Sequence, residues 1–254
     1  MVNEFYIPGD LRAARVKDLF TRIAPRYDLI NDLQSFGLHR YWKHRIVNLA
    51  RPAATDRALD LCCGTGDLAF LMTQRGARVL GLDFSDRMLE VAMNRNQRAR
   101  RSDRDSTGDS TPPAVGAAPH FVQGDALQLP FPDKSFDIVT IAYGLRNLAD
   151  IKAGLGEMRR VMKPSGRLLV LDFGKPDNPI WRVLYFGYLR MFVPLLGRIF
   201  CGSASAYAYI LESLRHYPAQ RGVAAQMTEL GLANIRIINL LGGVMSINYA
   251  ENQS

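Results

Sequence analysis

Three aspartates stand at the ends of predicted strands around one glycine-rich turn. The stretch RALDLCCGTGDLAF (57–70) ends an apolar strand pattern, turns at GTG (64–66) and continues as a helix. Asp60 precedes this turn, Asp83 ends the next predicted strand and Asp125 ends the third. Parallel strands present their carboxyl ends at one edge of a sheet, and that edge is where such α/β folds bind ligands. We therefore expect the three carboxylates to meet at one binding site.

The turn itself is compatible with two ligands. GTGDLA fits the dinucleotide fingerprint G-x-G-x-x-A through Gly64 and Gly66, and Asp83 is placed to bind a ribose hydroxyl. A dinucleotide sets its pyrophosphate on the helix N-terminus, where Asp67 would repel it. S-adenosylmethionine has no phosphate, and its sulfonium and ammonium groups are cationic. The spacing thus favours methyl transfer, with an NAD-dependent oxidoreductase as the competing function class.

Helix and strand patterns alternate along the chain and predict a mostly parallel α/β sheet with helices on both faces. The predicted strands are 57–63, 77–84, 120–126, 136–144 and 166–173. The predicted helices are 11–24, 37–50, 67–75, 86–100 and 151–162. The tail, 234–250, has two β runs around Gly242 and Gly243, which indicates a hairpin.

Two segments differ from this pattern. Residues 101–119 are polar and rich in Pro and Gly, which predicts a flexible insertion. Residues 180–200 are very apolar, but Arg182, Arg190 and Arg198 recur along them and argue against a membrane span. We interpret this second segment as a buried or capping helix, or as a cover over an apolar ligand that touches the bilayer interface.

Composition sets limits on the environment and the partners. The 254 residues are 48% hydrophobic and 22% charged, which is ordinary for a globular protein with a core. The net charge of +8 is not accompanied by a nucleic-acid-binding motif, so we expect no nucleic acid partner, while an anionic membrane surface remains open. Three cysteines without a C-x-x-C pair and an N-terminus without a signal pattern favour the cytoplasm. His39 and His44 are five apart, off the spacing of a zinc-binding helix, and we expect no metal.

Longer motifs resemble the ubiquinone/menaquinone C-methyltransferase family. LDLCCGTGDLAF, LDFSDRMLEVA and RVMKPSGRLLVLDFGKP carry the resemblance along the chain. The most specific parts of the resemblance are APRYDLIND, GLHRYWK and YGLRNLAD. The motif residues are most similar to those of the menaquinone and phylloquinone members. The match runs from about residue 17 to the LLGGV near the end.

The resemblance implies a Rossmann-like class I S-adenosylmethionine-dependent methyltransferase fold. Its seven-stranded, mostly parallel sheet has an antiparallel last strand. We expect an N-terminal helical lid over 1–50, a methyltransferase domain over 51–254 and an apolar helical cap at about 177–218. Together with the strand-end argument, the resemblance gives these cofactor-binding candidates: Asp60, Gly64, Thr65, Gly66, Asp83, Phe84, Asp125 and Ala126. The chain departs from the family at Asp125, where many members have Asn, and at Ala142, where many have Ser.

The implied reaction methylates a ring carbon of a prenylated quinol, converting demethylmenaquinol to menaquinol and leaving S-adenosylhomocysteine. C-methylation of a polyprenyl benzoquinol in ubiquinone synthesis is the alternative. An ionised quinol oxygen makes the ortho carbon nucleophilic, so the site must favour the phenolate and exclude water. Arg146 and Asn147 are the catalytic candidates after the fourth predicted strand, with Arg146 stabilising the phenolate or, alternatively, pairing with Asp150.

The N-terminal segment supplies further candidates. Tyr27 is placed to hydrogen-bond a quinol oxygen, or else packs as an ordinary aromatic, and Asp28, Asn31 and Tyr143 are candidates for substrate contact. The resemblance is compatible with a peripheral contact at the inner face of the membrane and with a homodimer. A binding protein that has lost activity is a third function class, against which the intact turn, acids and GLRN argue.

Overall fold

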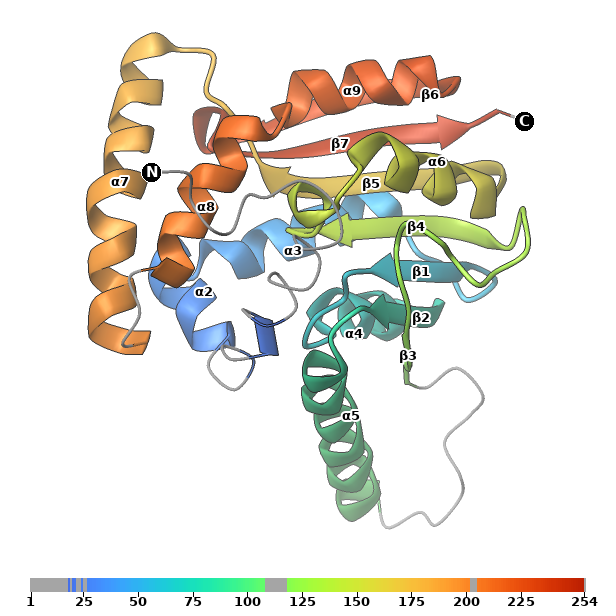
Figure 1. Cartoon of the computed structure of the whole chain (residues 1–254). Coiled ribbons are helices and arrows are strands. Elements are labelled where there is room, and N and C mark those ends of the chain that lie inside the picture. The colour runs from blue at the N-terminus through green and yellow to red at the C-terminus, as the bar shows by residue number, and fades with distance from the viewer. Residues whose placement is uncertain are drawn as a thin grey trace.

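The computed structural model describes Asp18, Phe20, Thr21, Ala24 and residues 27–107, 118–201 and 205–253. Its strands are β1 (Arg57–Leu61), β2 (Arg78–Asp83), β3 (His120–Gln123), β4 (Phe136–Ala142), β5 (Met162–Phe173), β6 (Leu232–Leu240) and β7 (Met245–Asn252). They form one seven-stranded sheet in the order β3-β2-β1-β4-β5-β7-β6 (Figure 1).

The strand directions match the predicted topology. The strands β1 to β5 pair in parallel, and the buried apolar runs of the central strands β1, β4 and β5 are typical of strands covered on both faces. The last strand, β7, is antiparallel to both β5 and β6, which confirms the expected antiparallel strand and the hairpin around Gly242 and Gly243. The chain passes outward from β1 to β3 and returns to β4 on the other side of β1, which makes the β1–β4 junction the switch point of the sheet.

Helices cover both faces of the sheet, as predicted. They are α2 (Tyr27–Ser35), α3 (Leu38–Ala50), α4 (Asp67–Gln74), α5 (Asp86–Thr107), α6 (Ile151–Val161), α7 (Pro179–Cys201), α8 (Ser205–His216) and α9 (Ala219–Glu229). One core lies under α3 and α4, where Trp42, Ile46 and Met72 are buried. The other lies under α6 and α9, where Leu155 and Val223 are buried. The sheet is thus the middle of three layers.

Two local predictions were wrong. The sequence patterns placed no helix between 24 and 37, but residues 27–35 form α2, which carries Asp28 in its first turn where the helix dipole favours an acid. The flexible insertion was placed over 101–119, but α5 continues to Thr107 because neither Gly nor Pro interrupts the chain before Gly108. Residues 108–117 of that insertion, and most of the predicted helix 11–24, lie outside the described residues.

The two strands at the switch point end earlier than predicted. The strand β1 stops at Leu61, because Cys62 has a left-handed φ of 51°, and β4 stops at Ala142, because Tyr143 has a φ of 60°. Such conformations are uncommon for residues with a side chain and turn the chain out of the sheet. Both turns open toward the carboxyl edge of the sheet, where the candidate site lies.

Helices α7 and α8, which lie within the segment predicted as an apolar cap, are side by side (Figure 1). Helix α7 also contacts α2, where the Tyr188 hydroxyl donates to the Gln34 carbonyl at 3.0 Å. Its inner side buries Tyr185 and Leu189. No helix within the described residues combines the length and the apolar character that crossing a bilayer requires.

Candidate active site

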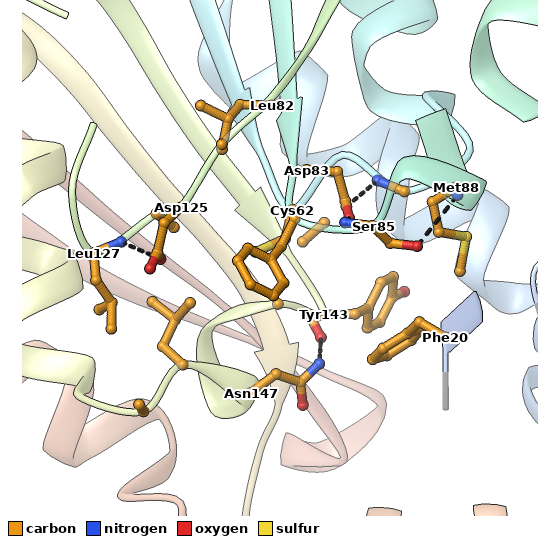
Figure 2. A pocket seen from close by; sticks show the side chains of 18 of the residues that line it. Phe20, Cys62, Leu82, Asp83, Ser85, Met88, Asp125, Leu127, Tyr143 and Asn147 are labelled. Atoms are coloured by element: carbon orange, nitrogen blue, oxygen red, sulfur yellow. Dashed lines mark hydrogen bonds between the residues drawn. The ribbon is translucent and has the colours of Figure 1, made fainter. Parts of the chain in front are cut away.

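A cleft opens at the carboxyl edge of the sheet, beside the β1–β4 switch point (Figure 2). It contains about 860 Å³ of empty space, part of it open to solvent, which is within the size range of small-molecule sites. Residues that follow β1, β2, β3 and β4 line it, together with Phe20 and Tyr27 from the N-terminal region. Its described walls are mostly apolar, with Asp83, Asp125 and Asn147 among their few polar side chains.

The glycine turn forms one wall of the cleft. Gly64 has a φ of 55°, and its backbone N–H donates to the Asp83 carboxylate at 2.8 Å. Gly66 has a φ of 86°, and a Cβ at this position would lie 2.7 Å from Cζ of Phe121. Gly66 does not line the cleft, so its role is to let the turn pack against Phe121, while Gly64 keeps the backbone open toward a ligand.

Asp83 is held in place by the backbone and faces the cleft. One carboxylate oxygen accepts from Gly64 N and the other from Ser85 N, each at 2.8 Å. Burial raises the pKa of Asp83, although these backbone hydrogen bonds oppose the rise. A carboxylate has about four lone-pair sites, so Asp83 keeps acceptor capacity for a ligand beside its backbone donors. That capacity suits a vicinal diol such as that of a ribose.

Asp125 and Ala126 line the same cleft after β3. Asp125 accepts from the Leu127 backbone N–H at 2.9 Å, which fixes its side chain, and its carboxylate can accept from an exocyclic amine. Phe84 lines the neighbouring wall and is partly exposed, which suits a flat heterocycle. Figure 2 shows that Asp83 and Asp125 come from neighbouring strand ends and face one space.

Two predicted cofactor-binding residues lie behind the wall rather than on it. Asp60 is buried in the sheet and accepts from the Thr140 hydroxyl at 2.9 Å, and burial raises its pKa to about 7. Thr65 is also buried, and its hydroxyl donates to Asp28 at 3.0 Å. Neither side chain lines the cleft, because Asp60 is bound to Thr140 within the sheet and Thr65 to Asp28 of α2.

Asp67 does not act as the sequence argument assumed. It forms ion pairs with Lys43 at 2.6 Å and with Arg95 at 2.7 Å. Burial alone would raise its pKa, but these two cations lower the pKa of Asp67 to about 2. Because its charge is already neutralised, repulsion from Asp67 is not a reason to exclude a dinucleotide. The sequence argument missed this because Lys43 is 24 residues away and lies on another helix.

The other side of the cleft presents two phenols and an amide. Tyr27 and Tyr143 both line it, and burial raises the pKa of each, so both keep their proton at neutral pH. Asn147 lines it too, and its amide donates to the Tyr143 carbonyl at 3.3 Å. Among the described residues, the buried Tyr143 hydroxyl has no hydrogen-bond partner. A buried donor without a partner is costly unless a ligand satisfies it.

Arg146 lies beneath the cleft and does not line it. It is buried, and its guanidinium forms an ion pair with Asp172 at 2.7 Å. The alternative pairing with Asp150 is wrong, because Asp150 caps α6 by accepting from Ala153 N at 2.9 Å. The positive charge of Arg146 still reaches the cleft, where it contributes to lowering the pKa of Tyr27 and works against the effect of burial.

Asp28 and Asn31, expected near the substrate, also lie outside the wall of the cleft. Asp28 accepts from Thr65 and pairs with Arg95 at 3.3 Å, so it fastens α2 to the glycine turn. Asn31 acts on the cleft through Tyr27, where it works against the rise that burial causes in the pKa of that phenol. Asp28 therefore holds α2 in place beside the glycine turn.

Several cleft residues were missed by the sequence analysis. They are Phe20, Cys62, Leu82, Ser85, Met88, Gly124, Leu127, Gly144, Leu148 and Ala149. Ser85 and Met88 directly follow the strand-end Asp83, so proximity to that acid was an available signal. Nothing in the sequence marked Cys62, because its left-handed turn depends on the fold. In the described part of the chain no three His, Cys, Asp or Glu side chains form a cluster that could hold a metal ion.

Comparison with known proteins gives a consistent result. A model of the ubiE/COQ5 methyltransferase family matches residues 9–252. Demethylmenaquinone methyltransferase of Thermus thermophilus is 41% identical over 235 residues, which are 92% of this chain and 99% of that protein. The ubiquinone/menaquinone biosynthesis C-methyltransferase UbiE of Ectopseudomonas mendocina is 39% identical over 246 residues, 95% of this chain and 90% of that protein.

Solved structures share the fold at lower identity. Magnesium protoporphyrin IX methyltransferase from Synechocystis with bound SAH has a TM-score of 0.64 at 18% identity and covers 94% of this chain and 99% of its own. A putative S-adenosylmethionine-dependent methyltransferase from Methanococcus maripaludis has a TM-score of 0.62 at 19% identity and covers 93% of this chain and 94% of its own. Both have the fold of class I methyltransferases.

Proposed function

The chain belongs to the ubiE/COQ5 methyltransferase family, and we propose that this S-adenosylmethionine-dependent C-methyltransferase of quinone biosynthesis acts on demethylmenaquinol. The products are menaquinol and S-adenosylhomocysteine, in the last step of menaquinone or phylloquinone synthesis. One observation carries the proposal: a single cleft joins two carboxylates that suit the cofactor to two neutral phenols and an amide that suit a quinol. The Thermus relative, named for this substrate, supports it.

The residues present fit the cofactor. Asp83 keeps acceptor capacity for the ribose diol, Asp125 has a carboxylate for the adenine amine, and Gly64 lets the backbone approach. Asp60 is buried behind the glycine turn and does not line the cleft. When bound, S-adenosylmethionine supplies an electrophilic methyl group on a sulfonium. A carboxylate-lined wall lowers the energy of this cationic ligand, and the apolar surroundings strengthen the effect.

The quinol is held by Tyr143, Asn147 and Tyr27. The Tyr143 hydroxyl is satisfied when it donates to a quinol oxygen, and Tyr27 and Asn147 are within the same cleft to bind the other oxygen. Because both phenols stay protonated, they can donate to an ionised quinol oxygen and stabilise it. Electron density then shifts to the ring carbon, which takes the methyl group, and the ring loses a proton. Arg146 contributes positive charge from beneath the cleft.

A ubiquinone-pathway benzoquinol is the second candidate substrate, because the Ectopseudomonas relative is named for both pathways. The test is methyl transfer from radiolabelled S-adenosylmethionine to reduced demethylmenaquinone and, separately, to the matching benzoquinol. Label in the naphthoquinol alone supports the proposal, and label in both would extend it to two pathways. Label in the benzoquinol alone would overturn the assignment to menaquinone.

The nicotinamide and non-catalytic alternatives are tested by binding. Since Asp67 is neutralised, the case against NAD rests on family membership. We expect S-adenosylhomocysteine to raise the melting temperature and NAD to leave it unchanged. A rise with NAD would favour the oxidoreductase, and cofactor binding without transfer to either quinol would favour the binding protein.

We also propose that the outer face of α7 contacts an anionic membrane from the cytoplasmic side, where a prenylated quinol is found. Ile180, Val183 and Met191 are 72%, 73% and 72% exposed and recur at helical spacing. Helix α7 carries three arginines, two of them exposed on its described part as Arg182 and Arg190, and no acidic residue. Aliphatic side chains among arginines suit an anionic interface. A homodimer through this face would bring the arginines of two copies together, and their like charges would repel each other.

The membrane proposal is tested with vesicles of phosphatidylcholine with and without phosphatidylglycerol. We expect sedimentation with the anionic vesicles only, and at least tenfold weaker partitioning for Ile180→Asp with Val183→Asp. Met93→Asp, which changes a 42%-exposed residue on α5, is the matched control and should bind as the wild type does. Unchanged partitioning of the double variant would overturn the proposal, and a dimer that the double variant disrupts would assign this face to a second copy.

A further inference from the structure

Asp172 is a buried carboxylate near the end of β5, outside the wall of the cleft. We propose that Asp172 is a positioning residue, which holds the segment 143–147 in the shape that presents Tyr143 and Asn147 to the substrate. Its effect passes through Arg146, the residue that joins the two strand ends. For its kinetic consequences this inference rests on the proposed function, while its structural consequence does not.

The first step is the number of hydrogen bonds that one carboxylate accepts. Asp172 Oδ1 accepts from Arg146 Nη1 at 2.7 Å and from the Phe173 backbone N–H at 2.8 Å. Asp172 Oδ2 accepts from the Arg146 backbone N–H at 3.1 Å. The carboxylate therefore binds the main chain and the side chain of Arg146 at once. Strand β5 anchors it, since Asp172 pairs with Ser246 of the neighbouring β7.

The second step leads from Arg146 to the cleft. Arg146 Nη1 also donates to the Tyr143 carbonyl at 2.6 Å, and the Asn147 amide donates to the same oxygen at 3.3 Å. The guanidinium carbon lies 4.6 Å from the centroid of the Phe173 ring, which fixes its plane further. The side chains of Arg146 and Asn147 thus share the Tyr143 carbonyl, and the position of that carbonyl depends on the Arg146–Asp172 pair.

The third step is that this segment needs such support. Tyr143 has a φ of 60°, a conformation that a residue with a side chain adopts only when its surroundings enforce it. Gly144 is pressed against the other wall, because a Cβ there would lie 2.5 Å from Cβ of Cys62. The Tyr143 backbone N–H is bound to the Leu171 carbonyl at 2.7 Å, which fastens the start of the segment to β5, and the Asn147 N–H is bound to the Gly144 carbonyl at 2.9 Å within the segment. Asp172 fastens the middle of the segment to β5 through both the main chain and the side chain of Arg146.

The charges also favour positioning over direct action. Asp172 forms an ion pair with Arg146 at 2.7 Å, and both side chains are almost fully buried, with exposed fractions of 1% for Asp172 and 6% for Arg146. A buried pair of this kind costs desolvation, and fixing one local conformation is a use to which such pairs are put. Here the conformation fixed is that of a segment with two cleft-lining side chains.

The main test is Asp172→Asn, which keeps the shape but loses the charge and places an amide against a backbone N–H. We expect amide hydrogen exchange in a peptide covering 143–148 to become at least tenfold faster, with exchange in 83–88 unchanged. For the quinol we expect kcat/KM to fall at least tenfold, with the Kd of S-adenosylmethionine within twofold of wild type.

Asp137→Asn is the matched control. Asp137 is paired with Lys163 at 2.8 Å and accepts from Arg57 N, at the opposite end of β4. The Asp137→Asn variant should have a lower free energy of unfolding, with no change in kcat/KM or in amide exchange at 143–148. Because Asp172→Asn leaves a buried guanidinium without its counter-charge, a second variant combines Asp172→Asn with Arg146→Gln and removes both charges. Its exchange at 143–148 should still be at least tenfold faster.

Unchanged exchange at 143–148 in both variants would overturn the inference whatever the substrate is. Faster exchange with an unchanged kcat/KM would also overturn it, because the held conformation would then have no role in the reaction. An equal fall of kcat/KM in the Asp137→Asn control would mean that the fall in Asp172→Asn comes from a general loss of stability, which would also overturn the inference. A wild-type enzyme without quinol activity would count against the proposed function, and the exchange measurement would still decide whether Asp172 holds the segment.

Discussion

Replacement of Asp83 by Asn tests the cofactor side of the cleft. Both carboxylate oxygens of Asp83 already accept a backbone N–H, from Gly64 and from Ser85, each at 2.8 Å. An Asn side chain has only one oxygen, so it can satisfy only one of these donors, and its NH₂ group must face the other. The variant therefore loses the charge, one backbone contact and one acceptor for the ligand.

The expected magnitude follows from those losses. A hydrogen bond to a charged group is worth about 1.5–3 kcal/mol. Each loss of about 1.4 kcal/mol of binding free energy raises Kd tenfold. Loss of one such bond to the ribose diol should raise the Kd of S-adenosylmethionine about ten- to 150-fold. The quinol contacts lie on the other wall and should be unaffected.

Isothermal titration of S-adenosylhomocysteine and S-adenosylmethionine into the wild type and Asp83→Asn measures this change. Asp133→Asn is the control, because Asp133 is 69% exposed, pairs with Arg160 and lies outside the cleft wall. A Kd of Asp83→Asn within twofold of the wild type, with the control also unchanged, would refute the assignment of Asp83 to the cofactor.

Three further predictions concern Asp60, Gly66 and Tyr143. Burial raises the pKa of Asp60 from 3.8 to about 7, so between these pH values the folded protein holds a proton that the unfolded chain has lost. The free energy of unfolding should therefore fall by about 4 kcal/mol from this group as the pH rises through that window. Urea titrations should show this pH dependence in the wild type and not in Asp60→Asn. Gly66→Ala places a Cβ 2.7 Å from Phe121 at a φ of 86° and should cost about 2 kcal/mol of unfolding free energy, part of which Phe121→Leu restores; an unchanged urea midpoint would contradict this. Tyr143→Phe removes a hydroxyl that has no partner among the described residues, so the melting temperature should not fall, while the KM for the quinol should rise about tenfold. A lower melting temperature together with the higher KM would argue for a structural role of the hydroxyl.

Two of the three strand-end acids, Asp83 and Asp125, lie on the wall of the cleft as the sequence predicted, whereas Asp60 does not. The reason is geometric, because parallel strands share one carboxyl edge and the strand period can be read from the apolar residues. The antiparallel last strand came from the family resemblance, and the hairpin from the two glycines at 242–243. Sequence reasoning thus reached the topology and the side of the sheet that carries the site.

What the sequence could not give was the direction of side chains at sharp turns. Asp60 and Thr65 lie within the predicted motif but do not line the cleft, while the chain between them turns at Cys62 and Gly64 with left-handed φ values of 51° and 55°. Such values are enforced by packing over the whole fold. No local pattern marks them at Cys62.

Ion pairs across distant elements were the second limit. Arg146 pairs with Asp172, which is 26 residues away on the neighbouring strand, rather than with the nearby Asp150. Asp67 pairs with Lys43 from another helix, which removed the electrostatic argument against a phosphate. A candidate charge in a sequence is therefore only half of an electrostatic argument, because its partner is chosen by the fold.

The central claim is that this cleft transfers a methyl group to a ring carbon of a demethylnaphthoquinol. The most direct test supplies S-adenosylmethionine with a ¹³C-labelled methyl group and reduced demethylmenaquinone, and locates the label in the product by NMR. The account predicts a ¹³C-methyl group on the ring carbon, formed by the wild type and at least tenfold more slowly by Asp83→Asn under subsaturating cofactor. A label on a quinol oxygen, or transfer that does not depend on Asp83, would contradict it.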